Sequence, residues 1–99
     1  MLKEEHNARI HLLAAVGVVL LGFYFSLSSL EWVAVLLCIG FVFAMELLNS
    51  AIEALADFVS VEHQALIKKA KDMAAAAVLV AALVAFVVGL LIFLPKIIS

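Results

Sequence analysis

Three long apolar stretches alternate with short polar segments along the chain, and this pattern predicts three membrane-spanning helices. Each stretch approaches or exceeds the roughly 20 residues that an α-helix needs to cross a bilayer. The predicted spans are residues 11–27, 32–57 and 73–94. Residues 28–32 hold small hydroxyl side chains, a carboxylate and a tryptophan, which favour a tight turn at the membrane surface. Pro95 is predicted to end the third helix.

The composition makes the membrane assignment firmer, because 69% of the 99 residues are hydrophobic, only 14% are charged, and the mean hydropathy is +1.32. A soluble domain is about 45–50% apolar and about 25% charged, so the soluble globular class is excluded. The net charge of -2 offers no basic surplus for nucleic acid. The chain is therefore predicted to be one all-α integral membrane domain over residues 1–99.

Basic residues fall mainly on one predicted side of the membrane. Lys3 and Arg9 precede the first span and Lys68, Lys69 and Lys71 precede the third, whereas the turn at residues 28–32 has none. Cytoplasmic segments carry the excess of Lys and Arg. We therefore expect the N-terminus and a loop at residues 58–72 to be cytoplasmic, and the C-terminus to lie outside.

One face of the second predicted helix carries five polar side chains near its cytoplasmic end. At 100° per residue they share a narrow sector of the helix. They are Glu46, Asn49, Ser50, Glu53 and Asp57. A carboxylate at the bilayer centre costs roughly 2.5–3.5 kcal/mol, less near the interface. Hydrogen bonds between helices would explain Asn and Ser, but two aligned carboxylates indicate a chemical site more than helix packing.

The two acids lie at different depths, and this suggests different tasks. Glu46 is about 21 Å from the level of Trp32, and Glu53 about 31 Å. An acid near the headgroups can hold a divalent cation together with substrate phosphates. A deeper acid can act as a base toward a substrate dissolved in lipid. The competing interpretation is a small proton-coupled or cation transporter, in which Glu46 alternates between protonated and ionised forms.

Two further polar clusters each allow either a structural role or a role in a chemical site. Lys71 and Asp72 belong either to a solvated loop, with Asp72 capping the third helix, or to a site where the lysine neutralises phosphate charge. Near the N-terminus, Glu5 and Arg9 are four residues apart and could form an ion pair on a helix.

Three sequence segments resemble the prokaryotic diacylglycerol kinase family. They are ELLNSAIEALAD at residues 46–57, AKDMAAAAV at residues 70–78, and EHNARIH at residues 5–11. The last is similar to the undecaprenol kinase branch of that family. Relative to the family the chain is expected to be N-terminally short, lacking an amphipathic surface helix ahead of Glu5. A catalytically inactive relative is therefore a further alternative.

The resemblance implies a bacterial cytoplasmic-membrane lipid kinase that is a homotrimer of three-span protomers with shared active sites. It would use ATP and Mg²⁺ to phosphorylate a membrane lipid alcohol, either undecaprenol or diacylglycerol.

The resemblance also implies a role for each matching residue. Glu46 would be the general base with Asn49 beside it, and Glu5 and Glu53 would hold magnesium. ATP would contact Glu62, His63, Gln64, Lys71 and Asp72. The lipid substrate would contact Asn7, Arg9 and His11, and Asp57 would support the site.

Overall fold

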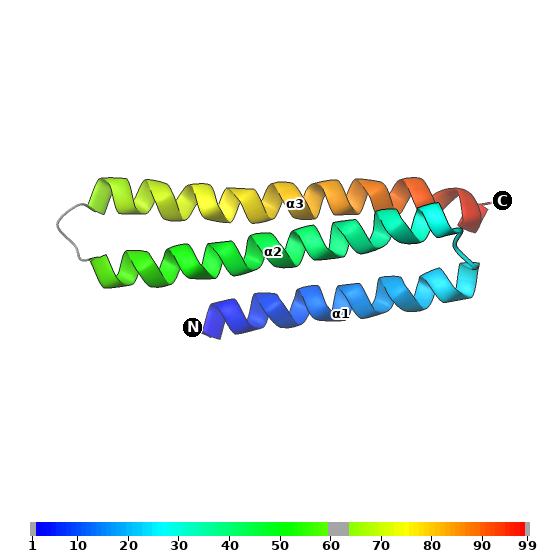
Figure 1. Ribbon diagram of the computed structural model, residues 1–99, viewed down its shortest axis with the longest axis horizontal. Helices are drawn as coiled ribbons and strands as arrows, with labels where there is room; N and C mark the ends of the chain where they lie inside the picture. Colours follow the sequence, from blue (N-terminus) through cyan, green and yellow to red (C-terminus); the bar gives the residue numbers. More distant parts are fainter. Residues whose placement is uncertain (1, 60–63, 99) are drawn as a thin grey trace.

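The computed structural model describes the backbone of residues 2–59 and 64–98, and the side chains of residues 8–59 and 65–98. Within these ranges the chain forms three α-helices: α1 (Leu2–Phe25), α2 (Ser29–Val59) and α3 (Gln64–Ile98). They run side by side as an elongated bundle of 57 × 20 × 20 Å (Figure 1). All three are long and apolar enough to cross a membrane. The predicted all-α, three-span membrane fold is confirmed.

The helices extend beyond the predicted spans, most of all at α3. Residues 64–72 belong to this helix, so the prediction of a loop through residue 72 is wrong there, and Asp72 lies inside the helix and does not cap it. The prediction that Pro95 ends the helix is also wrong, because α3 continues to Ile98. Tertiary contacts hold this end of α3 in place: Phe93 is buried, and the Nζ atom of Lys96 lies 3.2 Å from Oε1 of Glu31.

The turn between α1 and α2 is fixed by two local motifs. Ser26 has a φ of 56°, its N–H donates to the Phe23 carbonyl, and the Leu27 N–H donates to the Gly22 carbonyl, which is the Schellman pattern at a helix C-terminus. Ser28 and Glu31 then form a capping box at the start of α2. Backbone groups at both helix ends are thus satisfied, and the predicted tight hairpin is confirmed.

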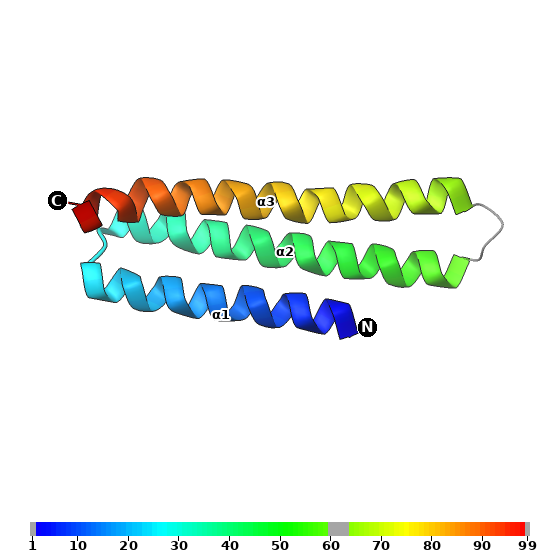
Figure 2. The same cartoon turned by 180° about the vertical axis from the view of Figure 1, so that it is seen from behind.

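The packing of the bundle is uneven. α2 lies between the other two helices and contacts α3 along much of its length, whereas α1 contacts α2 less extensively (Figures 1 and 2). A small core of Leu27, Val35 and Phe93 joins the three helices near the hairpin turn. Most other large apolar side chains of the described residues are exposed, as expected for a surface that meets lipid or other protomers. At the opposite end, α2 and α3 extend past the start of α1 (Figure 1).

Gly22 is required by the close approach of Trp32 across the hairpin. A Cβ atom at Gly22 would lie 2.6 Å from Cη2 of Trp32 and 3.1 Å from Cδ1 of Leu27. We expect Gly22→Ala to lower the free energy of unfolding by about 1–3 kcal/mol relative to Gly17→Ala, because overpacking forces the Trp32 ring to move. Gly17 is the matched control, since a Cβ there meets no atom within 4 Å. Denaturant titration in detergent micelles measures the difference, and equal stabilities of both variants would contradict the prediction.

Candidate functional site

The predicted polar face of α2 is turned toward the other helices. The Glu46 side chain is only 15% exposed, and Asn49, Ser50 and Glu53 are half-buried. On the opposite face the apolar residues are outside, and Leu47, for example, is 73% exposed. This arrangement is the reverse of a soluble amphipathic helix and suits a helix whose outer face meets apolar surroundings. The structure thus turns the predicted polar face inward at these four residues, whereas Asp57 is exposed.

Glu46 lies directly against a histidine of the neighbouring helix. Its Oε2 atom is 2.7 Å from Nδ1 of His11, and the His11 side chain is 23% exposed. Neither atom makes a well-aligned hydrogen bond with any described residue, so the two atoms are in close contact without an aligned hydrogen bond. This pair is the most enclosed meeting of two titratable groups in the described part of the chain.

The hairpin geometry brings the two residues together. His11 lies about 21 Å before the end of α1, and Glu46 about 26 Å after the start of α2, at 1.5 Å per residue. Two antiparallel helices joined by a tight turn therefore carry them to similar depths. Sequence reasoning did not pair them, although the similar distance of each from the turn was a usable signal.

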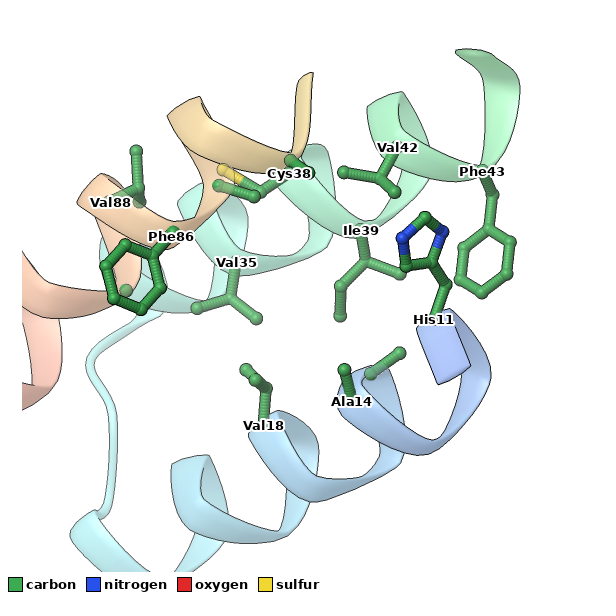
Figure 3. Close-up of a pocket in the computed structure, with 14 residues that line it drawn as sticks. His11, Ala14, Val18, Val35, Cys38, Ile39, Val42, Phe43, Phe86 and Val88 are labelled. Carbon is green, nitrogen blue, oxygen red and sulfur yellow. The ribbon is translucent and has the colours of Figure 1, made fainter. Parts of the chain in front are cut away.

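An apolar groove runs from His11 toward the hairpin turn. Its volume is about 270 Å³, and all three helices contribute to it. In Figure 3, Ala14 and Val18 of α1 point toward Val35 and Ile39 of α2, and His11 lies beside Phe43 at one end. Alanines 82 and 85 and Gly89 of α3 complete the wall with small residues. The groove is thus a hydrocarbon-lined space with His11 at one end, where the histidine also contacts Glu46.

Asn49 and Glu53 continue the polar face one and two turns beyond Glu46. The Oδ1 atom of Asn49 is buried and has no hydrogen-bond partner among the described residues. Glu53 is half-buried, and no ion pair to it occurs within the described side chains. Those side chains contain no cluster of three metal-ligating groups. Mg²⁺ is usually held by one or two carboxylates together with substrate phosphates, so the half-buried Glu53 fits a magnesium ligand.

The projecting ends of α2 and α3 carry a second charged set. Nζ of Lys71 lies 3.5 Å from Oδ1 of Asp57, and Nζ of Lys68 lies 3.2 Å from Oδ2 of Asp72. These side chains are more exposed than the His11–Glu46 pair, and Lys71 is 40% exposed. Lys71 and Asp72 are therefore open to a soluble ligand. They lie at the same end of the bundle as Glu53, because Lys71 contacts Asp57, one turn after Glu53 on α2.

Several predicted site residues are not part of this geometry. The side chains of Glu5 and Asn7 on α1, together with Glu62, His63 and Gln64, lie outside the described side chains. Arg9 is exposed on α1, two positions before His11. The proposed Glu5–Arg9 pair accordingly stays a prediction.

Comparison with known proteins gives a consistent result over nearly the whole chain. A family model described as prokaryotic diacylglycerol kinase matches residues 1–93. The undecaprenol kinase of Bacillus subtilis (strain 168) is 47% identical over 95% of this chain and 76% of its own length. No solved structure gives a significant match.

Proteins named diacylglycerol kinase are more distant. The one from Synechocystis is 36% identical over 96% of this chain and 55% of its own length. The one from Escherichia coli (strain K12) is 35% identical over 75% of this chain and 61% of its own length. The chain therefore spans a little over half of the length of these relatives, and about three quarters of the undecaprenol kinase.

Proposed function

The chain belongs to the prokaryotic diacylglycerol kinase family, a family of lipid kinases, and from this premise we propose that it transfers the γ-phosphoryl group of ATP to the hydroxyl of a membrane lipid alcohol. The observation that carries the proposal is the His11–Glu46 pair at the end of the apolar groove. A lipid alcohol has the matching form, a long hydrocarbon chain that ends in one hydroxyl. The groove receives part of the chain, and the hydroxyl lies at Glu46.

In the proposed reaction Glu46 accepts the proton of the lipid hydroxyl as the oxygen attacks the γ-phosphorus of ATP, and ADP leaves from the opposite side. Such transfers depend mainly on positioning and on neutralisation of phosphate charge. Lys71 offers a cation for the phosphates, and Asp57 and Asp72 hold the lysines in place. Glu53 and, by family resemblance, Glu5 would hold Mg²⁺, which supplies further charge neutralisation at the phosphates.

The remaining contacts of this proposal come from the family resemblance. Glu62, His63 and Gln64 line the nucleotide, and Asn7 and Arg9 meet the lipid headgroup. Asn49 lies one turn from Glu46, and its buried Oδ1 atom, which has no hydrogen-bond partner among the described residues, would accept a hydrogen bond from the substrate.

Undecaprenol is our proposed acceptor, and diacylglycerol is the alternative. The chain is 47% identical to a protein named undecaprenol kinase and 35–36% identical to the diacylglycerol kinases compared above. The residues 5–11 segment supports the same assignment. We further propose a homotrimer, with the N-terminus cytoplasmic and the C-terminus outside. The many exposed apolar side chains and the basic residues on α3 near its first turns support these proposals.

A phosphorylation assay with labelled ATP tests the proposed function. Purified protein in detergent is given undecaprenol or diacylglycerol in separate reactions, and label is followed into the lipid. We expect label to enter undecaprenol faster. Transfer to diacylglycerol alone would reverse the substrate assignment, and no transfer to either lipid would contradict the kinase proposal. Proton flux in proteoliposomes without ATP consumption would favour the transporter alternative.

A further inference from the structure

We propose that His11 is a positioning residue for Glu46: it holds the carboxylate at the end of the apolar groove, where the lipid hydroxyl arrives. This inference rests on the proposed function, in which Glu46 is the base. The family resemblance alone assigns His11 to the lipid headgroup, whereas the structure brings its Nδ1 atom to 2.7 Å from Oε2 of Glu46.

The first step of the argument is that Glu46 needs a polar partner. Its side chain is only 15% exposed, and a buried polar group without a partner is costly. A base must also lie within hydrogen-bond reach of the proton that it accepts, so the place of the carboxylate matters. A polar ring in contact with the carboxylate can meet both needs.

The second step is that His11 is the polar group placed to be this partner among the described residues. On α1, Arg9 is exposed and two positions away, so it points to a different side of the helix. On α2, the nearest titratable groups of the same face are Glu53, which is also acidic, and Cys38 two turns toward the hairpin. On α3, residues 73–94 carry no charged side chain. The described lysines contact Glu31, Asp57 and Asp72 or are exposed.

The third step concerns orientation. The ring N–H of His11 does not point along the line to Glu46 in the free protein. A modest rotation of either side chain would align a hydrogen bond, or would leave the carboxylate free for the lipid hydroxyl. His11 therefore holds the carboxylate in place, while the carboxylate oxygens stay free of a rigid hydrogen bond. Catalytic hydrogen bonds often become aligned only when substrate is bound.

NMR of the His11 imidazole tests the inference without any need for kinase activity. In Glu46→Gln we expect the ring signals of His11 to move relative to the wild-type protein, because the ring loses its contact with the carboxylate. The signals of the other two histidines, His6 and His63, serve as internal references and should be alike in both proteins. Unchanged His11 signals in Glu46→Gln would overturn the inference.

Kinetics give the second readout. His11→Ala should lower kcat by about 100-fold, because a misplaced catalytic group can cost that much, with a smaller change in KM for the lipid. His11→Gln keeps an N–H donor beside Glu46, so it should lose less of kcat than His11→Ala does. Added imidazole should restore part of the activity of His11→Ala. Leu13→Ala, at a 72% exposed position of α1, is the matched control and should keep the wild-type kcat.

The two proposals can fail separately. A wild-type protein that transfers no phosphoryl group would refute the proposed function, while the NMR comparison would still decide whether His11 contacts Glu46. An active wild-type protein whose kcat is unchanged in His11→Ala would refute the positioning role and leave the kinase assignment intact.

Discussion

Replacing Glu46 by Gln is expected to lower the rate of lipid phosphorylation by about 10²–10⁴-fold, the usual contribution of a general base. The amide has nearly the shape of the carboxylate but cannot accept the proton of the lipid hydroxyl. The measurement is kcat at saturating ATP and lipid. A rate within a few-fold of wild type would show that Glu46 is not the base.

The control for this experiment is Glu31→Gln, which makes the same chemical change in the same helix at the hairpin end. Glutamine can replace glutamate in the capping box with Ser28, so this variant should fold and stay active. The Glu46 variant should fold as well, because the amide has nearly the shape of the carboxylate and keeps a polar atom beside His11. Helical circular dichroism should therefore be alike in both variants and in the wild-type protein.

The second large effect is expected on magnesium dependence. Glu53→Gln should raise the magnesium concentration needed for half-maximal activity by at least about 10–100-fold. Even the mutation of a residue that only hydrogen-bonds to a metal ligand lowers metal affinity by this factor. Excess magnesium should restore much of the rate, because the base Glu46 is unchanged. The measurement is a magnesium titration of initial rates at fixed ATP.

Glu31→Gln is again the matched control, and its magnesium titration should overlap that of the wild-type protein. Overlap of the Glu53→Gln titration with both would count against the assignment of Glu53 to the metal. A loss of rate that no magnesium concentration restores would instead place Glu53 in the chemical step.

The sequence predicted the parts of this protein that depend on local pattern. Long apolar stretches gave the three helices, because a helix is the simplest way to satisfy backbone groups in lipid. The 100° spacing of helical residues placed Glu46, Asn49, Ser50 and Glu53 on one face, and their partial burial agrees with this. The predicted end at Pro95 and the predicted loop through residue 72 were wrong, because contacts with α2 extend α3 beyond what local signals indicate.

Partners that are distant in the sequence could not be found in this way. The pairing of His11 with Glu46 depends on how far each lies from the hairpin turn and on the rotation of each helix about its axis. The pairing of Asp57 with Lys71 likewise depends on α3 beginning earlier than predicted.

By itself, the sequence determined that this protein is a three-helix membrane protein of a lipid kinase family with a costly acidic face on its second helix. Composition, periodicity and short motifs carry that information, because each acts over a few turns of one helix. Only the tertiary structure decided what that face meets: a histidine at 2.7 Å and an apolar groove shared by all three helices. The physical reason is that the cost of a polar side chain in an apolar medium depends on its nearest polar neighbour. The packing of the helices decides which residue that neighbour is.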